Sequence, residues 1–130
     1  MKKLVSALLL SSVFFTACKK DDVPTTKEKL QNKWEFKSAT EKDFTVNPPA
    51  TSTYTFPGVF IEFRSDGKIY TSGSLGADTT GYSILNDKFL LIDGDSNEIV
   101  TLTANALQLK IVDRNPNGTA AYEFSQEFTR

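Results

Sequence analysis

Histidine is absent from this chain of 130 residues, and cysteine occurs once. The absence of histidine removes the most common general base and the most common metal ligand. A single cysteine excludes an internal disulfide and any metal site built from several thiolates. The sequence also has no Gly-x-Ser-x-Gly nucleophile elbow and no phosphate-binding glycine loop. We therefore predict that the protein is not an enzyme and uses no cofactor and no metal ion.

Neither sign of charge is in large excess, with 15 basic against 16 acidic residues. Removal of a leader containing Lys2 and Lys3 would leave 13 against 16, a net charge of −3. A mildly acidic domain has no electrostatic attraction to a phosphate backbone, so we exclude nucleic acid as a partner. The apolar run from Leu4 to Ala17 has 14 residues, fewer than the roughly 20 that span a bilayer as a helix.

That apolar run and its flanks have the pattern of a secretory signal peptide over residues 1–17. The sequence Phe15-Thr16-Ala17-Cys18 resembles the lipobox of bacterial lipoproteins, with Phe15 where leucine is more usual. The resemblance implies that Cys18 is the lipid attachment site and that acyl chains such as palmitate hold the mature protein on a membrane. The alternative is an ordinary signal peptide followed by a chance cysteine.

A charged cluster, Lys19-Lys20-Asp21-Asp22, follows the cysteine. It resembles the export signal that lipoproteins of the Bacteroidetes group carry next to their lipidated cysteine. The resemblance implies a lipid anchor in the outer membrane, with the cell surface as the destination. The simpler interpretation is a solvated charged tether. Residues 18–26 form this tether in either case, and the folded domain is predicted over residues 27–130.

The domain is predicted to be all-β, after a helical turn over Lys27 to Asn32 that Thr25 or Thr26 caps. Apolar and polar residues alternate, and turn signals recur every 8 to 12 residues or so. Short turns join antiparallel neighbours, so we expect an eight-stranded antiparallel up-and-down barrel; a β-sandwich is the competing architecture. The predicted strands are Lys33–Thr40, Val59–Arg64, Lys68–Ser72, Gly81–Leu85, Lys88–Asp93, Glu98–Thr103, one through Leu107 and Ile111, and one through Tyr122 and Phe128.

Three loop motifs have both a chemical and a plain interpretation. Asp93–Asn97 and Asp113–Gly118 space oxygen ligands as calcium loops do, but both lack the closing acid, so we expect hairpin turns. Asp93 and Asp95 are the nearest approach to a carboxylate pair and are expected to remain in water. Asp78-Thr79-Thr80 resembles an O-glycan acceptor, which would place a glycan on Thr79 in a loose connection; an ordinary polar loop is the alternative.

The domain resembles lipocalin-like domains of small bacterial lipoproteins. The likeness rests on the helix-to-strand segment Leu30–Phe36, the hairpin Phe63–Lys68, the strand Gly81–Ile84 and a late hairpin, with Asn32 where glycine is usual. It implies that Trp34 plugs the closed end of the barrel and that Arg130 lies over its ring as a cation–π partner.

The sequence is compatible with two functions. A barrel of eight strands holds packed side chains or one small apolar ligand, and a cavity above about 300 Å³ would favour the ligand. The alternative is an interaction or structural surface lipoprotein with a solid barrel, its contact patch at Thr51–Gly58 with Tyr54 and Phe56. The protein partner would be unknown. The candidate ligand-binding residues in the barrel interior are Phe36, Phe63, Tyr70, Tyr82, Leu91, Leu109, Tyr122 and Phe124.

Overall fold

The structure, a computed structural model, describes residues 23–130 of the chain. The signal peptide, Cys18 and the Lys19–Asp22 cluster therefore lie outside the described residues. Every strand pairing and every residue of the hydrophobic core lies between positions 30 and 129. A segment with its own complete core is able to fold as a unit, so residues 23–130 are suitable for experiments in isolation.

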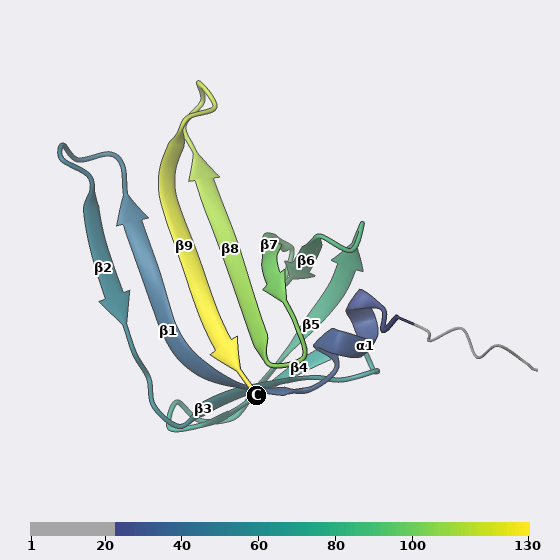
Figure 1. Ribbon diagram of the computed structural model, residues 1–130. Helices are drawn as coiled ribbons and strands as arrows, with labels where there is room; N and C mark the ends of the chain where they lie inside the picture. Colours follow the sequence, from purple (N-terminus) through teal and green to yellow (C-terminus); the bar gives the residue numbers. More distant parts are fainter. Residues whose placement is uncertain (1–22) are drawn as a thin grey trace, which may run out of the picture.

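The described chain contains one short helix followed by nine antiparallel strands (Figure 1). Hairpin turns join most neighbours, as the sequence predicts. At Ser65-Asp66-Gly67 the glycine has φ +77°, and the β6–β7 turn has positive φ at both Asp93 and Gly94. The elements are α1 (Thr26–Leu30), β1 (Lys33–Asp43), β2 (Ala50–Tyr54), β3 (Val59–Phe63), β4 (Lys68–Gly73), β5 (Asp78–Leu85), β6 (Phe89–Ile92), β7 (Asp95–Leu102), β8 (Ala106–Arg114) and β9 (Ala120–Thr129).

Eight of the strands form a closed antiparallel barrel, and β2 is an extra strand. The order is β2-β1-β3-β4-β5-β6-β7-β8-β9, and pairing of β1 with β9 closes the ring. The predicted eight-stranded barrel is confirmed, and the sandwich alternative is wrong. Closure gives each barrel strand a hydrogen-bonded neighbour on both sides, so the apolar faces of all eight meet in one core.

The extra strand β2 was not predicted, because the segment around it reads as polar and aromatic without clear alternation. It pairs with the second half of β1, Ala39 opposite Tyr54, whereas β3 pairs with the first half on the same side. β2 and β3 thus act as one long strand interrupted at Thr55–Gly58, where Pro57 cannot donate to the ladder and Gly58 has φ +75°.

Four strands continue beyond the closed part of the barrel as an open sheet, which we call the wall (Figure 1). The wall consists of residues 39–43 of β1, 50–54 of β2, 111–114 of β8 and 120–124 of β9. Its inner face continues the inner face of the barrel, because β1, β8 and β9 run from the barrel into the wall and alternate residues of a strand lie on the same face. The hydrophobic core, by contrast, lies in the closed part, with Ala39 as its one member on the wall.

The base of the barrel is closed by α1 and Trp34, both next to the start of β1. Thr25 and Glu28 form a reciprocal capping box at the start of α1, so Thr25 is the cap that the sequence offered. Leu30 and Trp34 are both completely buried, and the indole Nε1 donates to the Leu30 carbonyl oxygen at 3.0 Å. The helix is thereby fixed to the first strand through the only tryptophan of the sequence.

Several strand limits and one face differ from the sequence predictions. The strands β5 and β7 begin at Asp78 and Asp95, each three residues earlier than predicted, because they continue ladders with β4 and β6. Simple alternation along this strand would put Ser38 on the same face as Trp34 and Phe36, but Ser38 is opposite Glu127 on the outer face. An irregularity between Phe36 and Ser38 reverses the alternation and brings Ala39 inward.

Candidate functional site

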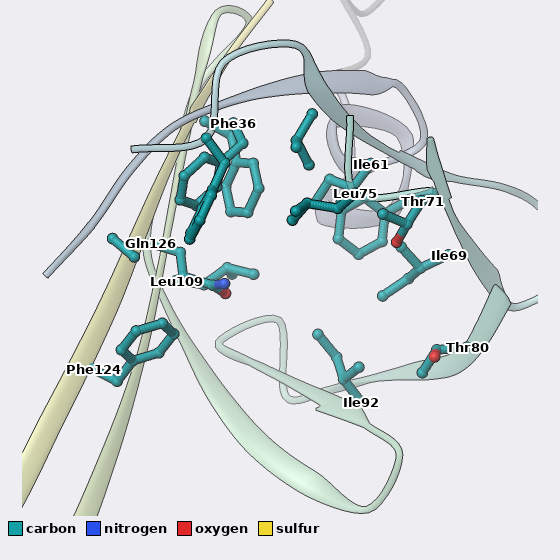
Figure 2. Close-up of a pocket in the computed structure, with 15 residues that line it drawn as sticks. Phe36, Ile61, Ile69, Thr71, Leu75, Thr80, Ile92, Leu109, Phe124 and Gln126 are labelled. Atoms are coloured by element: carbon teal, nitrogen blue, oxygen red, sulfur yellow. The ribbon is translucent and has the colours of Figure 1, made fainter. Parts of the chain in front are cut away.

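The barrel interior contains a cavity of about 330 Å³ between the core and the wall (Figure 2). Most of its lining is aliphatic or aromatic, and the side chains come from β1, β3, β4, β5, β6, β8 and β9 and from two loops. The lining residues are Phe36, Ala39, Phe56, Val59, Ile61, Phe63, Ile69, Thr71, Leu75, Thr80, Ile92, Leu109, Phe124, Gln126 and Phe128.

Two loop residues, Phe56 and Leu75, form the rim of the cavity. Their exposed fractions are 42% and 63%, so the cavity reaches solvent at this side. The strand interruption allows Phe56 to turn inward, where its ring lies 5.8 Å from that of Phe36. The Ser74 hydroxyl donates to the Pro57 carbonyl oxygen at 3.0 Å, which joins the two rim loops.

Three polar side chains, Gln126, Thr71 and Thr80, also reach the cavity. Figure 2 shows the Gln126 amide directed into the space between the apolar walls. Gln126 lies on β9 between Phe124 and Phe128 on the same face, opposite Ala39 of β1. An amide can donate and accept at once, so this group can orient a polar atom of a bound molecule.

Half of the eight candidate ligand-binding residues line the cavity: Phe36, Phe63, Leu109 and Phe124. Tyr82 packs against the core but lies beside the cavity, not on it, with its ring edge-on to Phe63 at 5.1 Å. The Tyr82 hydroxyl donates to the backbone carbonyl of Arg64 at 2.9 Å, so it already has a partner without any ligand.

The other three predicted residues, Tyr70, Leu91 and Tyr122, do not line the cavity. Leu91 is opposite Ser83 on the outer face, because its neighbours Leu90 and Ile92 occupy the inner face of the short strand β6. Tyr122 does face inward, but it lies high on the wall, where it is 40% exposed. The barrel is no longer closed at that height, which the sequence pattern does not show.

Tyr70 lies on the outer face of β4, opposite Glu62. Its hydroxyl donates to Asp66 at 2.8 Å, and the Arg64 guanidinium lies 4.0 Å from its ring centroid. The hydrogen bond from Tyr70 lowers the pKa of the exposed Asp66 carboxyl. Arg64 also donates to Glu62 at 2.7 Å and lowers the pKa of that carboxyl. These contacts hold the β3–β4 hairpin and have no connection with the cavity.

Sequence reasoning missed the parts of the site that come from loops and from polar residues. Phe56 was assigned to an exposed patch, and Leu75 falls between the predicted strands Lys68–Ser72 and Gly81–Leu85, yet both border the cavity. Gln126 was not considered, although its position two residues from both Phe124 and Phe128 on a strand was the available signal. The rim depends on how two loops meet, which no local pattern reveals.

No residue of the two calcium-like motifs, Asp93–Asn97 and Asp113–Gly118, lines the cavity. Asp93 belongs to the β6–β7 turn, and residues 115–118 form the β8–β9 turn. Thr79 is exposed in β5 opposite Tyr70, so it belongs to a strand and not to the loose loop that was predicted. Over residues 23–130, no group of three or more acidic, cysteine or histidine side chains is placed to hold a metal ion.

At the base, the Arg130 guanidinium carbon lies 5.7 Å from the centroid of the Trp34 ring. Trp34 has no exposed surface, and it belongs to the hydrophobic core together with Leu30 and Phe36. Both residues therefore belong to the closed end and not to the cavity rim. The described part of the chain has no helix with the length and apolar character needed to cross a bilayer.

Neither a protein-family model nor a curated protein matches this sequence. The class that the described residues define is a closed eight-stranded antiparallel barrel with one additional strand and an apolar cavity. The likeness to lipocalin-like lipoproteins stays a prediction from the sequence motifs.

Proposed function

We propose that this protein is an outer-membrane lipoprotein whose lipocalin-like barrel binds a small apolar ligand without catalysing a reaction on it. The observation that carries the proposal is the cavity of about 330 Å³ with aromatic walls and one inward amide, Gln126. Sites for small molecules are typically apolar hollows of about 300–1,000 Å³ with a few polar groups that fix orientation. This cavity is at the small end of that range.

A direct test uses residues 23–130 and the uncharged fluorescent probe N-phenyl-1-naphthylamine. Thr71 lines the cavity, whereas Ser72, the next residue of β4, faces outward opposite Phe60. We expect Thr71→Phe to weaken probe binding by about tenfold, because the larger ring fills the cavity, and Ser72→Phe to leave it unchanged. Circular dichroism verifies that both variants are folded. Equal probe binding by the two variants, or none by the parent, would contradict the proposal.

The membrane anchor is a separate part of the proposal and rests on the sequence around Cys18. We propose that acylation of Cys18 follows removal of residues 1–17 and that Lys20-Asp21-Asp22 directs the protein to the surface leaflet. Expression of the full chain with a clickable palmitate analogue should label the parent protein and leave Cys18→Ser unlabelled. Recovery of unlabelled parent protein from the soluble fraction would contradict the anchor.

A second candidate is an interaction or structural lipoprotein, favoured by one observation on the wall. Tyr54 is 41% exposed on β2, a strand whose far edge has no partner among the described strands. Exposed aromatic residues beside an unpaired edge are common in protein contacts. Replacement of Tyr54 by Ser would abolish capture of a partner protein in this case and would leave probe binding intact.

A further inference from the structure

The charged residues nearest to the cavity on the inner face are acidic, and none of the residues lining the cavity is charged. Glu41 is two residues beyond Ala39 on β1, and both point inward because no irregularity separates them. Glu41 is directly opposite Phe124, which lines the cavity. Opposed residues have Cβ atoms about 4.5–5.5 Å apart, so the Glu41 carboxylate stands at the edge of the cavity toward the wall.

Higher on the wall, the inner face has no positive charge to oppose Glu41. Asp43, Tyr122 and Asp113 form the next row across the strands, and the Asp43 carboxylate accepts from the Thr45 backbone N–H at 2.8 Å. The positive side chains of these strands lie elsewhere. Lys42 faces outward and pairs with Glu123 at 3.3 Å.

Two other basic residues of these strands also have partners, one a carboxylate and one a backbone carbonyl. Lys110 faces outward and pairs with Glu98 at 3.1 Å, and Arg114 donates to the Gly118 carbonyl oxygen at 2.9 Å. None of the four ion pairs among the described residues includes Glu41, which is only partly exposed. The space next to the cavity is therefore a region of negative potential. Glu41 is the carboxylate that contributes to it from the wall, and Asp78 and Asp95 are opposite the lining residues Thr71 and Ile92 on the other strands.

We propose that Glu41 selects the head group of the ligand: the site takes an amphiphile with an apolar body and a cationic amine head. The apolar part fills the cavity beside Gln126, and the ammonium group lies beside the Glu41 carboxylate on the wall. A carboxylate head in the same place would face Glu41 without any lysine or arginine to balance it. This inference rests on the proposed ligand-binding function and specifies the chemistry of its ligand.

The test compares three probes of equal chain length, decylamine, decanol and decanoate, by titration calorimetry on residues 23–130. At about pH 7 the amine is protonated and the carboxylate is ionised, so the three heads are positive, neutral and negative. We expect decylamine to bind about tenfold more tightly than decanoate, with decanol between them. Added salt should reduce this ratio, because mobile ions screen the interaction between the head and Glu41.

Two charge-neutralising variants localise the effect. Glu41→Gln should remove most of the preference for the amine and leave the affinity for decanol unchanged. Glu127→Gln is the matched control, because Glu127 is an exposed carboxylate on the outer face of β9, opposite Ser38. It removes the same charge from the same sheet, and the preference should persist in it.

The outcomes separate this inference from the proposed function. Binding of decanol with no preference for the amine, or a preference that survives in Glu41→Gln, overturns the role of Glu41 and leaves apolar ligand binding intact. Failure of all three probes to bind the folded domain overturns both. A preference lost in Glu41→Gln and kept in Glu127→Gln supports the proposal.

Discussion

At the scale of single residues, the position of a polar group relative to the barrel decides what it does. The hydroxyl groups of Tyr70 and Tyr82 both have protein partners, Asp66 and the Arg64 carbonyl, so neither needs a ligand. The Gln126 amide points into the cavity instead. A buried or half-buried polar group without a permanent partner gains most from a ligand, because desolvation otherwise costs free energy. Gln126 is therefore the better ligand-binding candidate.

The contact between Tyr70 and Asp66 predicts a pH-dependent effect of Tyr70→Phe. The hydrogen bond lowers the Asp66 pKa in the folded state, so its contribution is present when the carboxyl is ionised in the unfolded chain. That contribution disappears as the pH falls through the lowered folded-state pKa, below the ordinary value of 3.8. Tyr70→Phe should thus be less stable than the parent near neutral pH and equal to it in strong acid.

Urea unfolding at several pH values measures this effect, with Tyr122→Phe as the control. No hydrogen bond of the Tyr122 hydroxyl is present among residues 23–130, and its removal should cause no pH-dependent difference. A constant difference between Tyr70→Phe and the parent down to strongly acidic pH would refute the assignment to Asp66.

At the scale of elements, the interruption between β2 and β3 is the feature that creates the rim of the cavity. An uninterrupted strand would keep its alternation and its ladder, but Pro57 and Gly58 release the chain for a few residues. The loop after β4 supports this release, since the Ser74 backbone N–H and hydroxyl donate to the Gly58 and Pro57 carbonyl oxygens. Two loops far apart in the sequence thus position Phe56 and Leu75 together.

Gly73 is the residue at which these loops come closest, and Gly73→Ala should destabilise the protein strongly. Its φ is +113°, and a Cβ atom there would overlap the Gly58 carbonyl oxygen. Backbone atoms cannot move aside as a flexible side chain can, so we expect a loss of about 3 kcal/mol in the free energy of unfolding.

Gly76→Ala provides the comparison for this substitution. Gly76 also has a positive φ, +93°, but a Cβ atom there meets nothing within 4 Å. Its cost should be the conformational strain alone, about 1 kcal/mol. Denaturant titrations of the two variants give both values, and similar losses would show that the contact between the loops is not the cause.

At the scale of the whole molecule, the barrel has a packed base and an open upper part. Leu30, Trp34 and Leu90 have no exposed surface, whereas β2 has only exposed residues. Closure of β1 on β9 joins the first strand to the last, so the sheet cannot come apart at one end without the loss of this pairing. The base thus provides stability, and the open part provides access to the cavity.

The position of the only tryptophan predicts cooperative unfolding that one fluorophore reports. Trp34 lies where β1 pairs with β3, and it also contacts α1 through its indole nitrogen. In urea, the midpoint from Trp34 fluorescence and the midpoint from far-ultraviolet circular dichroism should coincide, as in two-state unfolding. Separate midpoints, with fluorescence changing after the dichroism, would show that the base forms an independent unit.

The sequence by itself determined the class of the fold. Period-two alternation in Leu107–Ile111 and turn signals such as Ser65-Asp66-Gly67 act between near neighbours, so they can be read without a structure. The same alternation correctly predicted that Trp34 is buried and that half of the candidate ligand-binding residues line the cavity. The sequence did not predict strand β2, because its pairing depends on the partner β1 and not on its own side chains.

Tertiary structure alone decided which residues meet at the site. The irregularity near Ser38 reversed one face of β1, the register set Tyr70 and Leu91 outward, and two distant loops formed the rim. Glu41 became a neighbour of Phe124 only through closure of β1 on β9. The physical reason is that alternation specifies two faces for each strand, whereas the side that encloses a cavity, and its height along the wall, are fixed by long-range pairing.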